Sequence, residues 1–378
     1  MRPKRVAIVH DWLNQHGGAE RVLEVLHDLF PDAPIYTSIF DPKAMPPEYR
    51  RWKVVTSFMQ ALPGVARHHQ WYLPLYPLAF DSFDLAEFDL VISNSSGFCH
   101  GVLVRADACH VNYCLTPPRF LWNFEAYVER EAIGPVLRAL LRPLISLLRL
   151  WDAAAAQRVD FFIGISRAVV ARIRRVYRRD AWLLHPPVET DRFRPADRFE
   201  DYFLVVSRLV PYKRVDLAVE AANRLRVPLL VVGDGRDRPR LERMAGPTVK
   251  FLGRLRTEQV AELMSRSRAL IFPGEEDFGI VPVEAMASGR PVIAYAAGGA
   301  LDTVIEGRTG VLFREQTADT LAEVLAAFRP EEFDPAALRA FARQFDTAEF
   351  KRKFLALVER AMASSGPTAP GVEAELPG

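Results

Sequence analysis

Two carboxylates bracket one strand-to-helix turn in the C-terminal half of the chain. Glu276 and Glu284 flank an apolar segment in EEDFGIVPVEAMASG, residues 275–289, directly after the strand-like run ALIFPG. Carboxylates are good bidentate acceptors for vicinal hydroxyls, so one could hold a sugar and the other a ribose. The helix that follows is predicted to be VPVEAMASG, with Glu284 in its first turn. Helix capping by Glu275, Glu276 or Asp277 is the alternative interpretation.

Two basic residues leave another predicted strand. Arg208 and Lys213 follow the apolar run YFLVVS and enter a helical pattern. Both cations could converge on one anion at the edge of a sheet, whereas solvated charge is the alternative for Lys213 or Arg214. No D-x-D triplet occurs in the chain. A diphosphate is therefore expected to be neutralised by these side chains and by helix termini, without a metal site.

Glycines mark two further turns. Gly17 and Gly18 stand between an apolar run and a helical pattern, and backbone without side chains there can hydrogen-bond a phosphate or a sugar. A loop that needs a positive φ is the alternative. In VVGDGRDRPRLERM, Arg238 stands where a dinucleotide fingerprint needs its third glycine, so we predict a plain strand-to-helix turn.

The elements that must position these residues are alternating strands and helices. Apolar runs of strand length recur between helical patterns, which predicts an α/β fold with parallel sheets covered on both faces. The predicted strands lie in residues 5–12, 53–58, 89–95, 110–115, 161–166, 181–185, 202–209, 228–235, 249–254, 269–274, 291–295 and 310–313.

A Pro-rich, charged segment, residues 185–201, separates two series of strands and is predicted to be a linker. We therefore expect two doubly wound Rossmann-like domains, residues 1–188 and 189–345, that face each other across a ligand-binding cleft. Residues 346–365 are expected to form a helix that packs back on the N-terminal domain. Residues 366–378 are small and Pro-rich and are expected to be disordered.

Composition excludes several classes of protein. The chain has 378 residues, and its 49 basic and 47 acidic side chains nearly cancel, which argues against nucleic-acid binding. Cys99, Cys109 and Cys114 lack the paired spacing of metal ligands and are predicted to be buried thiols in a reducing compartment. The N-terminal apolar run is too short for a signal peptide. No apolar run reaches the ~20 residues that span a bilayer, so we expect a cytoplasmic protein.

One segment is both apolar and basic. In IGPVLRALLRPLISLLRLW, residues 133–151, three arginines fall on one helical face among many leucines: Arg138, Arg142 and Arg149. Such a segment, kinked at Pro143, could lie in an anionic membrane surface, or it could pack on its own domain. The aromatic stretch HHQWYLPLYPLAF, residues 68–80, could line an acceptor channel or contact lipid.

Several motifs together resemble a known family. GGAERVL, SRLVPYKRVDLAVEA, VVGDG, FLGR and EEDFGIVPVEAMASGRPVIAYAAGGALDTVIEGRTGVLF, in this order, resemble the retaining GT-B glycosyltransferases of family 4. The resemblance reaches to about Phe350. It implies that the C-terminal domain binds a nucleotide-diphosphate-sugar donor and the N-terminal domain an acceptor. Arg208 and Lys213 would hold the diphosphate, Glu276 the donor sugar, and Glu284 the ribose.

The resemblance also implies further site residues. The implied donor-binding positions are the backbone amides of Phe278, Gly279, Ile280 and Val281, the base-proximal Arg254 and Leu255, and Gly17 and Gly18 from the other domain. Such enzymes resemble one another in lacking an obvious protein nucleophile, and retention is explained by same-face attack in which the departing phosphate takes the acceptor's proton.

The acceptor side departs from the family pattern. The segment VNYCLTPPRF resembles a motif that usually reads C-H-T-P-x-R, but Leu115 replaces its histidine, while Thr116 and Arg119 keep the rest. His100 and His110 are nearby in sequence, yet either could be a loop or core histidine.

These features lead to one preferred function and three alternatives. We expect a metal-independent transferase that moves a hexose, with mannose from GDP-mannose preferred, to a saccharide or lipid-linked acceptor in cell-surface polysaccharide or glycolipid synthesis. A nucleotide-sugar epimerase and a non-catalytic nucleotide-sugar-binding partner remain open. A hydrolase using Glu276 and Glu284 would leave the Arg208/Lys213 pair idle.

Overall fold

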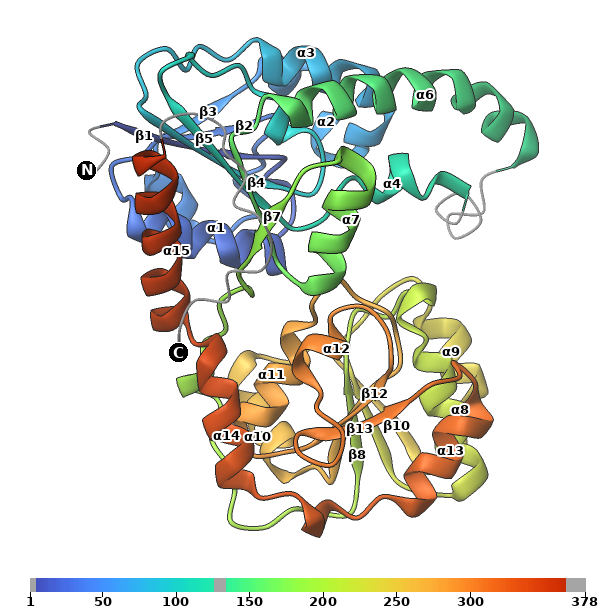
Figure 1. The fold of residues 1–378 in the computed structure, drawn as a ribbon. Coiled ribbons are helices and arrows are strands. Elements are labelled where there is room, and N and C mark those ends of the chain that lie inside the picture. The colour runs from blue at the N-terminus through green and yellow to red at the C-terminus, as the bar shows by residue number, and fades with distance from the viewer. Residues whose placement is uncertain (1–4, 126–133, 365–378) are drawn as a thin grey trace. The chain divides into compact units, whose positions relative to one another are not determined.

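All described strands lie in two parallel sheets, one in each of two units (Figure 1). The structure, a computed structural model, describes residues 5–125 and 134–364. The N-terminal unit contains the described residues up to His185 and again those from Phe350, and the C-terminal unit is Pro186–Glu349. The chain therefore passes between the units twice.

The N-terminal unit is built on a seven-stranded parallel sheet of order β3-β2-β1-β4-β5-β6-β7. Ile8 of the central strand β1 lies opposite Ile35 of β2 and Ile92 of β4. The strands are β1 (Val6–His10), β2 (Ile35–Thr37), β3 (Val54–Thr56), β4 (Leu90–Ser95), β5 (Cys109–Cys114), β6 (Phe161–Gly164) and β7 (Ala181–Leu183).

Helices cover this sheet on both faces. Their bounds are α1 (Gly18–Leu29), α2 (Val65–His68), α3 (Tyr76–Asp81), α4 (Arg119–Trp122), α6 (Pro135–Gln157), α7 (Arg167–Tyr177) and α15 (Thr347–Ala363), with short 3-10 turns η1 (Pro47–Arg51), η2 (Phe58–Ala61), η3 (His69–Leu75) and η4 (Cys99–Gly101). α7 begins where the Ser166 hydroxyl accepts a hydrogen bond from Val169 N, a typical N-cap.

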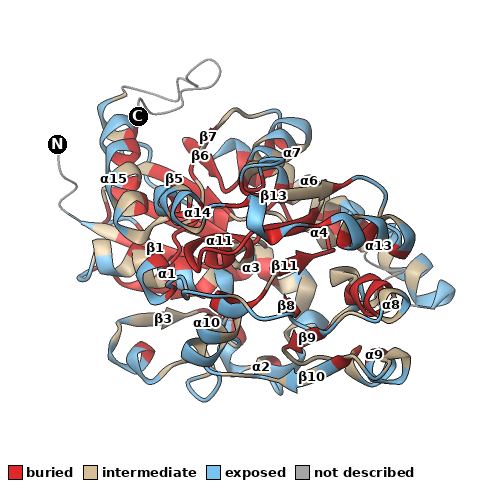
Figure 2. Ribbon diagram, turned by 90° about the horizontal axis from the view of Figure 1, so that it is seen from below, coloured by how far each residue is buried: buried red, intermediate tan, exposed pale blue. Residues whose placement is uncertain are grey.

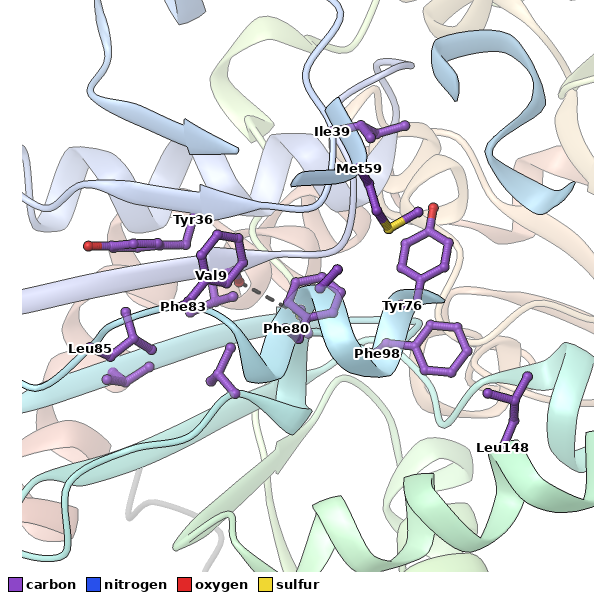
Figure 3. Packing of buried hydrophobic residues seen from close by; sticks show 14 of the residues in the cluster. Val9, Tyr36, Ile39, Met59, Tyr76, Phe80, Phe83, Leu85, Phe98 and Leu148 are labelled. Carbon is purple, nitrogen blue, oxygen red and sulfur yellow. Dashed lines mark hydrogen bonds between the residues drawn. The ribbon is translucent and has the colours of Figure 1, made fainter. Parts of the chain in front are cut away.

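An aromatic cluster packs between the sheet and α3. The Tyr76 and Phe98 rings stack with centroids 5.2 Å apart, and Phe80 and Phe83 extend the cluster toward Tyr36 (Figure 3). All five side chains are buried. The cluster anchors the end of the segment of residues 68–80 against the sheet, so Tyr76 and Phe80 belong to the core, whereas Trp71 of the same stretch is exposed.

The C-terminal unit is built on a six-stranded parallel sheet of order β10-β9-β8-β11-β12-β13. Its strands are β8 (Phe203–Val206), β9 (Leu229–Val232), β10 (Val249–Gly253), β11 (Ala269–Phe272), β12 (Val292–Tyr295) and β13 (Gly310–Phe313). Its helices are α8 (Val215–Leu225), α9 (Arg238–Met244), α10 (Thr257–Arg266), α11 (Ile280–Ala287), α12 (Ala300–Thr303), α13 (Ala318–Ala327) and α14 (Pro335–Ala342), with η5 (Thr190–Arg192), η6 (Pro211–Lys213), η7 (Pro330–Glu332) and η8 (Arg343–Phe345).

Burial follows the sheets. In Figure 2 the central strand β11 is coloured as buried along its length, and so is most of α11, which is buried from Pro282 to Ala287. Among the described residues, no helix is long and apolar enough to cross a membrane.

Each sheet has one topological switch point. In the N-terminal unit the strand order reverses between β1 and β4, and in the C-terminal unit it reverses between β8 and β11. Ligands of doubly wound sheets bind beside the carboxyl ends of the strands at this point. We therefore expect ligand-binding residues in the loops that follow these four strands.

The predicted strands are confirmed, and one strand was missed. The missed strand is β2, Ile35–Thr37, and its length does not explain the miss, because β3 and β7 also have three residues and were predicted. The predicted terminal helix, residues 346–365, corresponds to α15, which ends at Ala363. The rings of Phe350 and Phe354 in α15 pack against the Tyr113 ring of β5, with ring centroids 5.6 and 6.2 Å apart. The tail predicted to be disordered, residues 366–378, lies outside the described residues.

Candidate functional site

The basic residues singled out in the sequence follow β8 at its carboxyl end. Arg208 is exposed two residues after the strand, and Lys213 ends η6. Tyr212 touches both cations: Arg208 Nη2 donates to its hydroxyl at 3.3 Å, and the Lys213 ammonium lies 5.2 Å from its ring centroid. An aromatic face attracts a cation, so Tyr212 helps to hold both side chains at the switch point.

Glu276 lies on the loop after β11, the strand next to β8. Its carboxylate forms an ion pair with the Lys213 ammonium, and the two side chains are 23% and 11% exposed. Water screens such a partly buried pair less than a surface pair, so the attraction is stronger. The structure thus brings the predicted catalytic residues Lys213 and Glu276 into contact, with Arg208 linked to them through Tyr212.

Two glycines that we had not singled out shape this loop. Gly299 N donates to Glu276 O at 2.8 Å. A Cβ on Gly298 would come within 2.2 Å of that oxygen, and a Cβ on Gly299 would come within 2.2 Å of Phe278 Cα. These glycines could have been identified from the sequence, because they stand between an apolar strand and a helical pattern in PVIAYAAGGALD.

A Gly299→Ala variant is expected to lose about 10- to 100-fold in transfer rate. The added methyl group overlaps backbone at Phe278, so the loop that carries Glu276 has to move, and small displacements of a positioned group have effects of this size. Initial rates of sugar transfer measure the effect. Gly134→Ala is the matched control, because a Cβ there meets no atom within 4 Å. Equal rates for both variants would contradict the positioning role.

Helix α11 begins directly after the loop. Gly279 precedes it with a φ of +85°, and Ile280 and Val281 fill its first two positions, whose N–H groups have no partner within a helix. Phe278 is buried. The prediction that Glu284 lies in the first turn is wrong: the positive φ at Gly279 lets the helix start at Ile280, so Glu284 is its fifth residue, and it is buried.

Arg254 and Leu255 follow β10, the edge strand that β9 separates from β8. They lie at the same carboxyl edge, two strands from the switch point. The turn after β9 leads into α9, as predicted. A Cβ at Gly233 would come within 1.8 Å of Ser207 O, so this glycine allows close backbone packing beside Arg208.

Gly17 and Gly18 lie in the N-terminal unit, where Gly17 caps α1 and Gly18 is its first residue. Neither has a positive φ, so the alternative of a loop that needs one is wrong. A buried network that we had not predicted lies behind them. His10 Nε2 is 3.4 Å from Glu20 Oε1, and Asn94 Nδ2 donates to Ala19 O at 2.9 Å. These contacts tie the start of α1 to β1 and β4.

Asp11, also missed in the sequence, holds the loop after β4. Its buried carboxylate accepts hydrogen bonds from four consecutive backbone N–H groups at 2.6–2.8 Å, those of Ser96, Gly97, Phe98 and Cys99. An ionised carboxylate forms short, strong bonds with such donors. Asp11 therefore fixes the loop at the switch point of the N-terminal sheet.

The acceptor-side candidates follow β5. Leu115 is partly exposed, and the Thr116 hydroxyl accepts a hydrogen bond from Arg172 Nη1 at 2.6 Å. Arg119 begins α4. The Thr116 hydroxyl is therefore held inside the unit, and its contact with Arg172 was not apparent from the sequence.

His100 and His110 are core histidines. The His110 ring accepts from or donates to the Ser93 hydroxyl at 2.8 Å, and burial lowers the pKa of His110 to about 3. His100 Nε2 lies 3.3 Å from an oxygen of Asp152, and both residues are buried. Neither ring is placed to exchange protons with solvent.

Parts of the chain are similar in sequence to known proteins. Residues 189–345 match the family described as "Glycosyl transferases group 1". A GDP-mannose-dependent monoacylated alpha-(1-6)-phosphatidylinositol monomannoside mannosyltransferase of Corynebacterium glutamicum is 32% identical over 224 residues, 51% of this chain and 58% of that protein. A GDP-mannose-dependent alpha-mannosyltransferase of Mycolicibacterium smegmatis is 44% identical over 108 residues, 28% of each chain. The matched segments thus span less than two thirds of these relatives.

Solved structures show the same fold. HepE of Anabaena in complex with UDP has a TM-score of 0.70 at 18% identity, with 94% of this chain and 100% of that chain covered. The sucrose-phosphate synthase of Thermosynechococcus elongatus has a TM-score of 0.72 at 21% identity, with 96% and 100% covered. The predicted fold, two Rossmann-like α/β domains as in GT-B glycosyltransferases, is confirmed, and so is the resemblance to that group.

Proposed function

The chain carries a glycosyl transferases group 1 domain in residues 189–345, and from this we propose that it is a retaining glycosyltransferase. It transfers a hexose from a nucleotide-diphosphate sugar to a saccharide or lipid-linked acceptor, without a metal ion. One observation supports this most strongly: the Lys213–Glu276 ion pair, with Arg208 beside it, at the switch point of the C-terminal sheet.

The two residues of the ion pair can each bind a different part of the donor. When the donor binds, its diphosphate takes the place of Glu276 as the partner of Lys213 and Arg208, and the freed carboxylate accepts hydrogen bonds from sugar hydroxyls. In the transition state the leaving diphosphate gains negative charge, which preorganised cations stabilise. The backbone N–H groups of Ile280 and Val281 also donate hydrogen bonds to the diphosphate, and the partial positive charge at the start of α11 favours the same anion.

The remaining donor contacts follow the strand order. Glu284 binds the ribose, and Arg254 and Leu255 lie toward the base. Gly17 and Gly18 of the N-terminal unit stay predicted donor-binding residues. Retention in one step means attack on the face from which the diphosphate departs, and the departing phosphate oxygen takes the acceptor's proton, so no protein nucleophile is needed.

GDP-mannose is the donor that we propose, because the two relatives described above are named as GDP-mannose-dependent. Calorimetric titration of the whole chain in the presence of EDTA is expected to show binding of GDP-mannose at least 10-fold tighter than binding of UDP-glucose. A Glu284→Gln variant should weaken GDP binding, since it loses a charged acceptor for the ribose hydroxyls. Binding of neither nucleotide would contradict the proposed function.

The kind of acceptor determines where in the cell the reaction takes place. A lipid-linked acceptor would place transfer at the cytoplasmic face of a membrane, and we propose this location for the synthesis of a cell-surface polysaccharide or glycolipid. Incubation with donor but no acceptor separates a transferase from an epimerase, because an epimer forms only in the second case. Loss of turnover in Glu276→Ala separates an enzyme from a binding partner.

A further inference from the structure

Helix α6 presents an apolar face to solvent. Val136, Leu140, Leu147 and Leu150 are 75%, 71%, 65% and 69% exposed. At ~100° per residue, their spacing places all four within an arc of roughly 80°. A surface helix normally turns its polar face outward, and aliphatic side chains gathered in this way mark a contact surface. We call these four residues the α6 stripe.

The inner face of α6 fixes this orientation. Ile145 and Leu148 belong to the same buried core cluster as Phe98, and Figure 3 shows Leu148 beside Phe98. Asp152 is fully buried, accepts a hydrogen bond from Trp122 Nε1 at 2.6 Å and lies beside His100. Rotating the helix to bury the stripe would expose this core and break these polar contacts. The stripe therefore stays outward.

The arginines lie on one side of the stripe only: at ~100° per residue, all three fall within an arc of roughly 40° that begins about 80° from the edge of the stripe. Arg138 and Arg142 both pair with Glu125, and Arg149 Nε donates to Leu121 O at 2.7 Å. Arg142 keeps 59% of its side chain exposed. The sequence pointed to a cationic face, but the structure shows an outward face of aliphatic side chains with a basic border.

We propose that the α6 stripe is the surface through which the chain docks on a lipid bilayer that contains anionic lipid, with α6 lying in the plane of the interface. Leucine side chains insert between the acyl chains, and the basic border faces the headgroups.

Charge favours a bilayer over a second copy of the chain. The only acidic residue in α6 is Asp152, which is buried. If two α6 stripes packed against each other with their basic borders together, each border would bring three arginines and one exposed acid, Glu125, so the net positive charges would repel. An anionic bilayer meets the same border with opposite charge.

Co-sedimentation of the full chain with vesicles tests this proposal. The chain is expected to bind vesicles of phosphatidylcholine with phosphatidylglycerol, and a Leu140→Ser/Leu147→Ser variant to bind at least about 10-fold more weakly. Leu252→Ser/Leu301→Ser, which changes two exposed leucines of the other unit, is the matched control and should bind like the parent. Arg142→Gln should lower binding about threefold and reduce its salt dependence.

Three outcomes would overturn the proposal: no vesicle binding by the parent chain, equal binding by the Leu140→Ser/Leu147→Ser variant, or a change of that variant from dimer to monomer in light scattering. Circular dichroism and nucleotide titration of the same variant establish that it is folded. Vesicle binding needs no donor, so a failure here is distinguishable from a failure of the proposed transfer activity.

Discussion

A Lys213→Ala variant is expected to lose roughly 100- to 1000-fold in kcat, the usual effect of removing one preorganised group that stabilises a developing charge. Lys213 is largely buried and paired with Glu276, so its ammonium is already held when a donor arrives. Removing it also leaves the carboxylate unpaired, facing the diphosphate. Donor affinity should therefore fall together with turnover, measured by calorimetry and by initial rates.

Two comparisons make this test specific. Lys250→Ala changes an exposed lysine of the same unit and should leave the rate within twofold. The Lys213→Ala/Glu276→Gln double variant should bind GDP more tightly than Lys213→Ala alone, because the repulsive carboxylate is gone, and directly paired residues are not additive. Full turnover in Lys213→Ala would refute the assignment of the site.

An Asp11→Ala variant is expected to lose about 3–5 kcal/mol of stability in the N-terminal unit. Four backbone N–H groups lose a charged acceptor at once, and each unsatisfied buried donor carries a substantial penalty. Faster amide hydrogen exchange at residues 96–99, together with a lower midpoint in urea, would report the change. Asp11→Asn should be intermediate, since its one remaining carbonyl oxygen can keep part of the set.

The control for Asp11 is an aspartate with only a surface partner. Asp107 is 75% exposed at its side chain and pairs with Arg105, so Asp107→Ala should change stability by no more than about 1 kcal/mol. If both variants unfolded at the same urea concentration, the loop after β4 would not depend on the carboxylate.

Local patterns were sufficient to predict the sheets. Each apolar run bounded by turn residues that we singled out is a strand, and β2 is the one described strand that was missed. The charged residues of the C-terminal site were also predictable, because the carboxyl ends of parallel strands share one edge of a sheet. The start of α11 was misplaced by one residue, since a sequence pattern does not show that Gly279 adopts a positive φ.

Contacts between distant segments were not predictable. The Asp11 carboxylate accepts hydrogen bonds from backbone amides that lie 85 to 88 residues away along the chain. A sequence pattern does not show which backbone N–H groups a carboxylate will bind. The outward face of α6 depends on Asp152, which looks like a surface residue until the structure shows it buried beside Trp122 and His100. Periodicity identifies an amphipathic helix, but the partners in the core decide which side faces water.

The return of α15 to the first unit has a consequence for protein synthesis. Tyr113 is translated early, but Phe350 and Phe354, which pack on its ring, leave the ribosome only after the whole C-terminal unit has been made. At ~5–20 residues per second, that interval is roughly 10 to 50 seconds. During this time the nascent N-terminal sheet has an uncovered aromatic patch, and we expect it to be a substrate for ribosome-associated chaperones.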